Sequence, residues 1–310
     1  MEKDFCALTF SEKERNCESV FIVNGPYWHL YTDGTEMQNI FCSDEEFNTG
    51  MWILASAICQ TREIEVITFE IMNNHIHMIL SGCRNSCMDM FDIFKRRLKK
   101  TMQHFGRVID WKKFKAEILP IESIRALRNE IIYVNRNAYV ANPRYTPVSY
   151  PWGGGCAYFN EWAHLLKPVK YKDLSIDKRR ELIHSKDITS CSRLQIIGNR
   201  VYIPSFCNIQ LGESLFADPR VYFNSLSRNA EAFSQIAERL KDSVFLTDGE
   251  LFSITIAHIS QKYNIQNTAH LSPQQKIECA RLLHLKYKAT KQQIRRLLRL
   301  EEKIIQELLP

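Results

Sequence analysis

Short runs of apolar and aromatic residues predict three β-strands in the first third of the chain. They are Tyr27 to Tyr31, Ile64 to Met72 and His75 to Leu80, and their composition is typical of strands bounded by turn residues. Asn73 and Asn74 separate the last two runs, and asparagine tolerates the left-handed backbone that tight hairpins use. The second and third runs therefore predict an antiparallel hairpin.

Apolar residues three to four positions apart predict helices around this hairpin. Ser43 and Glu46 form a predicted capping box at the start of the first helix. A basic amphipathic helix is predicted from Met90 to Phe105, and Gly106 ends it. A third helix is expected from about Glu122 to Val140. The order of elements predicts an α+β fold, with a ferredoxin-like or RRM-like antiparallel sheet, helices on one face, and a mainly helical C-terminal domain.

Residues 271–310 predict two capped helices joined by a short turn. Ser272 with Gln275, and Thr290 with Gln293, have the spacing of capping boxes. A helix, a short turn and a basic helix form the layout of a helix-turn-helix, although a generic three-helix bundle shares the pattern. The side chains expected to face outward on the second helix are Lys291, Gln292, Arg295, Arg296 and Arg299. This polar surface favours DNA binding.

Three domains are expected. Residues 1–165 form the α+β domain, which a turn-rich segment from Asn142 to Gly155 helps to close. Residues 166–250 form a connecting region of mixed and helical character, and residues 251–310 form the helix-turn-helix-like domain. The region from 167 to 248 carries no recognisable chemical motif.

Basic residues are concentrated in two windows of the chain. The whole chain carries a net charge of +6. Residues 93–115 contain nine basic residues and one acidic residue, and residues 271–310 contain nine basic and four acidic residues. Two basic patches indicate two surfaces for the phosphates of a nucleic acid, although each is also compatible with a solvated helix face.

Composition otherwise indicates an ordinary globular protein. Hydrophobic residues make up 45% of the chain and charged residues 25%. No apolar run approaches the roughly 20 residues that span a bilayer, and no apolar leader is visible at the N-terminus. The ten cysteines are scattered and are expected to be reduced thiols. We therefore expect a cytoplasmic protein that does not bind membranes.

His75 and His77 are the first candidates for chemistry. Side chains alternate between the faces of a strand, so these two histidines share one face, with Cβ atoms roughly 7 Å apart. Ile76 and Met78 lie on the other face and are expected to enter the core. The histidines then lie on the open face of the sheet, where two imidazoles at this spacing can converge on one metal ion.

Tyr133 and Asn137 are the second pair of candidates. They are four residues apart on the third predicted helix, so they share one helical face. An asparagine oxygen suits a hard cation such as Mg²⁺ or Mn²⁺, and a tyrosine one turn away could act as a nucleophile. A packing tyrosine is the alternative interpretation.

Three segments resemble the REP-associated tyrosine transposases, which are single-tyrosine members of the HUH endonuclease superfamily. The segments are FEIMNNHIHMIL around His75, Tyr133-Val-Asn-Arg-Asn137, and Tyr150-Pro-Trp-Gly-Gly-Gly. The resemblance covers about Tyr27 to Phe159. It departs from the family pattern where Asn73 and Ala138 replace prolines and glycines replace the serines after Trp152.

The resemblance implies a role for each matching residue. His75, His77 and Asn137 would hold a divalent metal ion, and Tyr133 would be the nucleophile that forms a 5′-phosphotyrosine with DNA. Tyr150 and Trp152 would be structural or would contact DNA. No separate general base can be identified from the sequence. The implied activity is metal-dependent cleavage and rejoining of single-stranded or hairpin DNA.

The expected phosphate contacts on the basic helix are Lys95, Arg96, Lys99 and Lys100. The C-terminal domain is expected to bind duplex DNA, and a homodimer is possible. Two alternatives stay open. One is a structural zinc site made by the two histidines with Cys83 and Cys87. The other is a regulator without catalytic activity that binds DNA through the helix-turn-helix.

Overall fold

The structure is a computed structural model of the chain. It describes residues 8–35, 37–141, 145–146, 148–161, 165–186, 188–228, 230–240 and 246–308. The chain divides into two compact units, one made of Met1–Tyr139 with Pro143–Phe223 and the other of Val140–Asn142 with Asn224–Pro310. Residues 166–223, which sequence analysis assigned to a separate connecting region, thus belong to the first unit.

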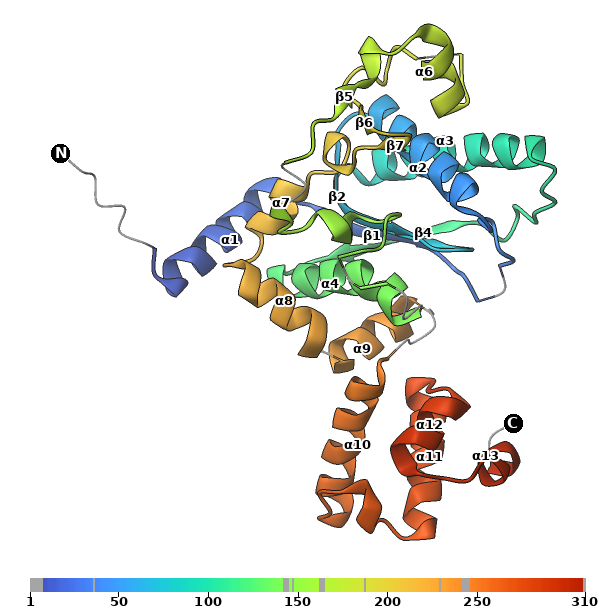
Figure 1. Cartoon of the computed structure of the whole chain (residues 1–310). Helices are drawn as coiled ribbons and strands as arrows, with labels where there is room; N and C mark the ends of the chain where they lie inside the picture. The colour runs from blue at the N-terminus through green and yellow to red at the C-terminus, as the bar shows by residue number, and fades with distance from the viewer. Residues whose placement is uncertain are drawn as a thin grey trace. The chain divides into compact units, whose positions relative to one another are not determined.

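A four-stranded antiparallel sheet forms the centre of the first unit (Figure 1). Its strands are β1 (Tyr27–Thr32), β2 (Ile64–Ile71), β3 (Ile76–Gly82) and β4 (Ala116–Ile121), in the order β2-β3-β1-β4. The predicted α+β fold with an antiparallel sheet and a mainly helical C-terminal region is confirmed. Strand β4 was not predicted, because Pro120 lies within it. Proline is tolerated there because β4 is an edge strand.

Four helices accompany the sheet: α1 (Phe10–Asn24), α2 (Asp44–Gln60), α3 (Arg84–His104) and α4 (Ile124–Ala141). Ser43 caps α2 as predicted, accepting a hydrogen bond from the Glu46 N–H at 3.2 Å. The Glu46 carboxylate accepts instead from the N–H of Cys42, so the expected reciprocal bond to Ser43 is replaced by one to its neighbour. Helix α1 was not anticipated from the apolar pattern, because only Cys17 is buried along it.

The helices cover both faces of the sheet. Figure 1 shows α2 and α3 above the sheet and α4 below it. The upper face carries buried apolar residues of the strands, among them Leu30, Met78 and Leu80, as alternation predicts for Met78. The lower face carries the histidines. The prediction that they lie on an open face is therefore wrong, because α4 packs over that face and buries both of them.

Two later segments pair with the outer edge of β2. The N–H of Ile71 donates to the Trp152 carbonyl at 2.9 Å, and the N–H of Asn208 donates to the Val66 carbonyl at 2.7 Å. The second contact falls where β2 departs from regular register, between Val66 and Thr68. An exposed strand edge invites pairing with other chains. Residues near 152 and 208 therefore protect this edge.

Residues 154–214 form small elements on the first unit. They are η1 (Gly154–Ala157), β5 (Val169–Lys170), η2 (Tyr171–Asp173), α6 (Ile176–Ile183), β6 (Gln195–Ile197), β7 (Arg200–Val201), η3 (Ile203–Ser205) and α7 (Ile209–Ser214). Strands β5, β6 and β7 form an antiparallel sheet, and Gly198-Asn199 form the turn between β6 and β7. Residues 167–214, which carry no chemical motif, thus contribute a second small sheet and part of the cover on the edge of β2.

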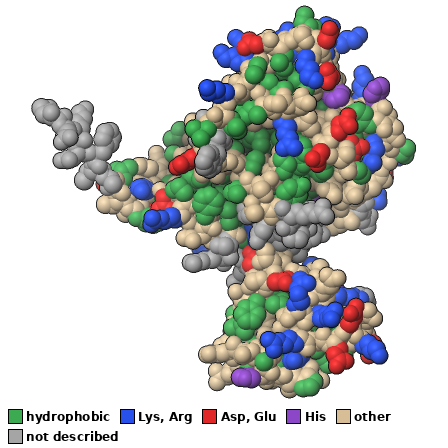
Figure 2. All heavy atoms as spheres, viewed as in Figure 1, with side chains coloured by type: hydrophobic (Ala, Val, Ile, Leu, Met, Phe, Trp, Pro, Cys, Tyr) green, Lys and Arg blue, Asp and Glu red, His purple; other side chains and the backbone are tan. Residues whose placement is uncertain are grey.

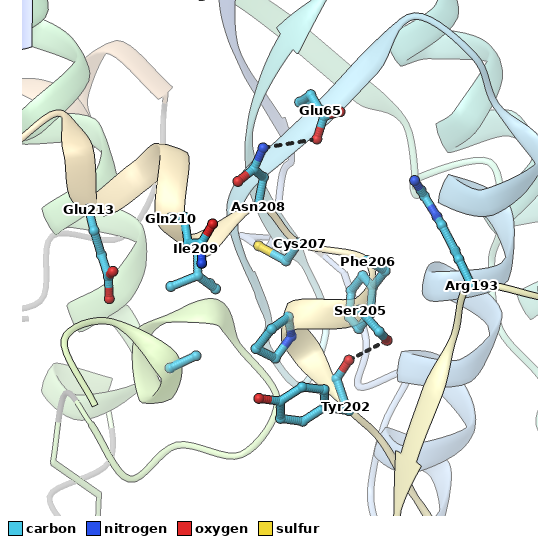
Figure 3. A pocket seen from close by; sticks show the side chains of 12 residues that line it. Glu65, Arg193, Tyr202, Ser205, Phe206, Cys207, Asn208, Ile209, Gln210 and Glu213 are labelled. Carbon is cyan, nitrogen blue, oxygen red and sulfur yellow. Dashed lines mark hydrogen bonds between the residues drawn. The ribbon is translucent and has the colours of Figure 1, made fainter. Parts of the chain in front are cut away.

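A cavity of about 380 Å³ lies among these elements (Figure 3). Arg193, Glu65 and Glu213 contribute charged side chains to its lining. Asn208 bonds to Glu65 across 3.4 Å. The lining includes neither His75, His77 nor Tyr133, so this cavity is separate from the residues that the sequence singled out.

Gly154 is required by its close approach to β2. A Cβ atom at this position would lie 2.5 Å from the Thr68 hydroxyl and 3.3 Å from the Thr68 Cα. The Thr68 hydroxyl also donates a hydrogen bond to Asn135 of α4. We therefore expect Gly154→Ser to lower the free energy of unfolding by about 1–3 kcal/mol, because the buried Thr68 side chain must move and its hydrogen bond to Asn135 is disturbed. Chemical denaturation followed by tryptophan fluorescence measures the change.

Gly198→Asn is the matched control for this substitution. Gly198 has a φ of 59°, which asparagine adopts, and a Cβ there would meet nothing within 4 Å. Its stability is expected to stay within about 0.5 kcal/mol of wild type. Trp28, Trp52, Trp111 and Trp152 belong to the first unit, so the fluorescence signal reports that unit. Equal stability of the two variants would contradict the prediction.

The C-terminal part of the chain is helical. Its elements are α8 (Pro219–Arg228), α9 (Ala230–Leu240), α10 (Asp248–Tyr263), η4 (Thr268–His270), α11 (Pro273–Tyr287), α12 (Lys291–Leu298) and α13 (Glu302–Leu308). The two predicted capping boxes, at the starts of α11 and α12, are both formed. Buried residues such as Leu251, Leu283 and Ile294 hold α10, α11 and α12 together. None of the helices in the described ranges could cross a membrane.

Candidate functional site

His75 and His77 lie side by side between the sheet and α4. Their ring centroids are 5.1 Å apart, with the ring planes at 90°. His75 is 7% exposed and His77 is fully buried. His77 stands opposite Tyr31 of β1 and Glu70 of β2 in the sheet, so all three share the face that α4 covers. The sheet therefore places a polar cluster where a core is usually apolar.

His29 of β1 joins this cluster. Its Nε2 lies 3.0 Å from Nδ1 of His77, and its Nδ1 lies 2.7 Å from the Glu130 carboxylate. His29, His77 and Glu130 are each at most 1% exposed. His29 and Glu130 were not predicted as members of the site. The available signals were that His29 shares a strand face with Tyr31, and that Glu130 lies three residues before Tyr133 on one helical face.

Tyr133 faces the histidines from α4. Its ring centroid lies 5.7 Å from that of His77 and 6.3 Å from that of His29. The side chain is 4% exposed. Residues 130, 133 and 137 fall on one side of the helix at intervals of three and four. The predicted nucleophile and the predicted histidine ligands are thus brought together.

Asn137 lies one turn beyond Tyr133 and is also buried. Its Nδ2 makes no hydrogen bond within the part of the chain that the structure describes. The neighbouring Asn135 uses its side chain differently: it accepts from the Thr68 hydroxyl and donates to Tyr222 at 2.9 Å. Asn137 therefore differs from Asn135 in that its amide nitrogen makes no such bond among the described residues.

Glu70 contributes a buried carboxyl group beside the cluster. It accepts hydrogen bonds from the backbone N–H groups of Asn137 and Ala138, the latter at 2.8 Å. Burial raises the pKa of Glu70 well above its usual range, and the two N–H donors oppose that shift. Glu70 thus ties the part of α4 that carries Asn137 to strand β2.

Two imidazoles and one amide oxygen form a donor set that fits a divalent cation. Nδ1 of His75 lies 2.7 Å from Oδ1 of Asn74, and Nδ1 of His77 lies 3.0 Å from His29. Because Nδ1 of each ring has this partner, Nε2 is the atom that would reach a metal. Both Nε2 atoms are buried. Imidazole and amide ligands suit Mn²⁺ and related ions. Within the described ranges, no group of three or more His, Cys, Asp and Glu residues could hold a metal.

The zinc alternative is therefore wrong. It needs His75, His77, Cys83 and Cys87 to converge, and no such group exists among the described residues. Cys83 is the exposed residue that precedes α3, and Cys87 is buried along α3. None of the nine cysteines that the structure describes forms a disulfide, in agreement with reduced thiols.

The basic residues of α3 lie away from this cluster. Arg96, Lys99 and Lys100 are exposed and Lys95 is half-buried, while the apolar side of α3 packs on α2 and the sheet. Figure 1 places α3 and α4 on opposite faces of that sheet. A DNA strand that contacted both α3 and the histidines would have to pass around an edge of the sheet.

Helix α12 presents the predicted polar surface. Lys291, Gln292, Arg295, Arg296 and Arg299 are all exposed, and they border a hollow of about 680 Å³ formed with α13. Figure 2 shows basic and acidic side chains intermingled on the C-terminal unit. Arg296 is paired with Asp248 at 2.7 Å and Arg295 with Glu302 at 3.1 Å. Within the described part of the chain, Lys291 and Arg299 form no ion pair. The Arg296 guanidinium holds the pKa of Asp248 below its usual range.

The first unit is thus an α+β domain with a buried His-Tyr-Glu cluster between an antiparallel sheet and a tyrosine-bearing helix. No protein-family model matches the sequence, and no curated protein matches it. A solved structure described as a REP-associated tyrosine transposase bound to a REP hairpin is similar to this chain. The match has 15% sequence identity and a TM-score of 0.34, and it covers 56% of this chain and 94% of that one. Its name is that of the family that the three sequence motifs resemble.

Proposed function

We propose that this protein cleaves and rejoins single-stranded or hairpin DNA through a covalent tyrosine intermediate. The observation that carries the proposal is the position of the Tyr133 ring, 5.7 Å from His77 and on the same side of the sheet as the His75–His77 pair. The family resemblance of the three motifs supplies the type of reaction. The similar structure, described as bound to a REP hairpin, agrees with a hairpin substrate.

Tyr133 is assigned the nucleophilic step. Its phenolic oxygen attacks the scissile phosphorus, the bond from phosphorus to the 3′ oxygen breaks, and the phenolic proton is lost while the 3′ oxygen leaves as a hydroxyl. The product is a 5′-phosphotyrosine, which keeps a phosphodiester bond for the rejoining step. Mg²⁺ or Mn²⁺ held by His75, His77 and Asn137 would offset the charge that develops on the phosphate.

Access to the site requires a local opening. Tyr133 is 4% exposed, so a phosphodiester reaches it only when α4 or a neighbouring segment is displaced. Binding energy from the rest of the DNA can drive such a displacement. Lys95, Arg96, Lys99 and Lys100 are proposed to hold single-stranded DNA, and the exposed side chains of α12 are proposed to hold duplex DNA.

Incubation of the full chain with 5′- and 3′-labelled hairpin and single-stranded oligonucleotides in Mn²⁺ tests the proposal. The expected result is a protein–DNA adduct that survives denaturation and carries the label on the 3′ side of the cut, with release of a free 3′ end. A non-catalytic regulator is the second candidate, favoured by the exposed basic face of α12. Sequence-specific duplex binding with no adduct on any substrate would support the regulator and overturn the proposal.

A further inference from the structure

Three buried side chains from three elements form a continuous hydrogen-bonded line. Glu130 of α4 contacts Nδ1 of His29 at 2.7 Å, and Nε2 of His29 contacts Nδ1 of His77 at 3.0 Å. Glu130 and His29 lie outside the three sequence motifs. Neither residue has a role at the phosphate in the proposed cleavage reaction.

Which atom donates in each hydrogen bond of this line depends on which ring nitrogens carry a proton. With Glu130 ionised and His29 neutral, Nδ1 of His29 carries the hydrogen that points to Glu130, because a carboxylate only accepts hydrogen bonds. Nε2 of a neutral His29 then accepts, which requires that Nδ1 of His77 be the donor. A neutral His77 with its hydrogen on Nδ1 has a lone pair on Nε2. That lone pair is what a metal ion needs.

His75 reaches the same state through a different partner. Nδ1 of His75 lies 2.7 Å from Oδ1 of Asn74. The amide orientation of Asn74 is fixed because its Nδ2 donates to the carbonyls of Gly34 and Met37, both at 2.8 Å. The amide oxygen can only accept, so His75 also carries its hydrogen on Nδ1. Two different hydrogen-bond arrangements therefore give His75 and His77 the same tautomer.

We propose that His29 and Glu130 are positioning residues that hold His77 in its metal-binding tautomer, with Asn74 doing the same for His75. The proposal rests on the proposed function, since it assumes that His75 and His77 hold a divalent ion. Metal-bound histidines commonly donate their second ring N–H to a carboxylate or carbonyl group, and removal of such partners weakens metal binding by about 10- to 100-fold. Here a second histidine lies between the ligand and the carboxylate.

The arrangement also links the metal site to the nucleophile. Glu130 and Tyr133 lie on the same face of α4, three residues apart. The contact that orients His29, and through His29 the ring of His77, is therefore made by the helix that carries Tyr133, labelled α4 in Figure 1. Docking of α4 on the sheet both places the tyrosine and completes the line to His77.

Mn²⁺ binding to the full-length protein, measured by electron paramagnetic resonance, provides the first test. Glu130→Gln and His29→Gln are expected to weaken Mn²⁺ binding by about 10-fold or more, because glutamine both donates and accepts and so no longer imposes a direction. Glu117→Gln is the matched control. Glu117 is a carboxylate of β4 that accepts from the Tyr31 hydroxyl at 2.7 Å and is not part of the line from Glu130 through His29 to His77. Its variant should bind Mn²⁺ within about 2-fold of wild type.

Histidine tautomers of the metal-free protein provide the second test. Long-range ¹H–¹⁵N spectra distinguish the two tautomers, and the His77 signals are assigned by their loss in His77→Gln. Wild type is expected to show His77 with its hydrogen on Nδ1, and Glu130→Gln to show a mixture or the opposite tautomer. Thermal unfolding of each variant verifies that it is folded, and both readouts are taken only on folded protein.

The outcomes separate this inference from the proposed function. A wild-type His77 with its hydrogen on Nε2, or wild-type Mn²⁺ affinity in Glu130→Gln, overturns the positioning role while leaving adduct formation untouched. Expected tautomers in a wild-type protein that forms no adduct overturn the proposed function while leaving the line of hydrogen bonds in place. A wild-type protein that binds no Mn²⁺ overturns both the metal site and the role assigned to Glu130.

Discussion

Replacing Tyr133 with phenylalanine is expected to abolish the covalent protein–DNA adduct, with a loss of about 10³-fold or more. The substitution removes one oxygen atom, and that oxygen is the only atom of the side chain that can bond to phosphorus. Loss of a nucleophile removes the whole chemical step, whereas loss of a contact to the substrate removes a few kcal/mol. Adduct yield on a hairpin oligonucleotide in Mn²⁺, resolved on a denaturing gel, measures the effect.

Tyr133→Phe is expected to fold, because the ring and its packing against His77 and His29 are retained. Tyr150→Phe is the matched control. Tyr150 is another buried tyrosine of the same unit, and its hydroxyl donates to the Ile71 carbonyl at 2.6 Å. Its loss leaves a buried carbonyl without that donor, which costs about 1–3 kcal/mol, but adduct formation per folded molecule should persist.

These two tyrosines therefore separate catalysis from folding. Folded Tyr133→Phe should form no adduct, whereas Tyr150→Phe should be less stable but should still form the adduct per folded molecule. An adduct of wild-type yield in Tyr133→Phe would mean that another residue is the nucleophile. Loss of the adduct in folded Tyr150→Phe would place the Tyr150 hydroxyl in the reaction as well.

The predicted part of the site consists of residues whose relation is local in sequence. His75 and His77 are two residues apart on one strand, and Tyr133 and Asn137 are one helical turn apart, so alternation and helical spacing give each pair a common face. His29 bonds to His77 across 48 residues and to Glu130 across 101. No periodicity in the sequence links residues at such separations. Strand order, which placed β1 beside β3, was needed to find them.

The face of the sheet that holds the histidines was mispredicted for a physical reason. Polar side chains on one face of a strand usually indicate contact with water. Here α4 covers that face, and the polar groups are satisfied by one another instead, as in the bonds of His29 with Glu130 and of Thr68 with Asn135. Hydrogen bonds between layers allow a polar interface to be buried. Apolar patterning alone could not reveal this interface.

The sequence shows where basic residues lie along the chain, but not where they lie relative to the histidine cluster. Arg96, Lys99 and Lys100 face solvent while Leu98 between them is buried, as an amphipathic helix predicts. Which face of the sheet α3 covers depends on chain crossovers, and those placed it opposite α4. In the C-terminal unit, Arg296 is engaged by Asp248, 48 residues earlier, a pairing that local pattern could not show. Lys291 and Arg299 are therefore stronger candidates for phosphate contacts than Arg296.

Replacing His77 with glutamine is expected to remove the response of the protein to Mn²⁺. In wild type, an ion that binds the folded state alone stabilises it, by about 2.7 kcal/mol when its concentration is 100 times the dissociation constant. Glutamine keeps much of the bulk of a fully buried side chain but removes the imidazole nitrogen. The shift of the thermal midpoint with Mn²⁺ should therefore disappear, and adduct formation should fall by about 100-fold or more.

His104→Gln is the control for this prediction, because His104 is an exposed histidine on α3, across the sheet from the cluster. Its thermal shift in Mn²⁺ and its adduct yield should match those of wild type, and chelation of the metal should reduce wild type and His104→Gln alike to the level of His77→Gln. Since the thermal shift needs no DNA, it tests the metal site apart from the reaction. If His77→Gln were stabilised by Mn²⁺ as much as wild type, the ion would bind elsewhere, and the buried imidazole pair would have to be explained by its hydrogen bonds to β1 and α4 alone.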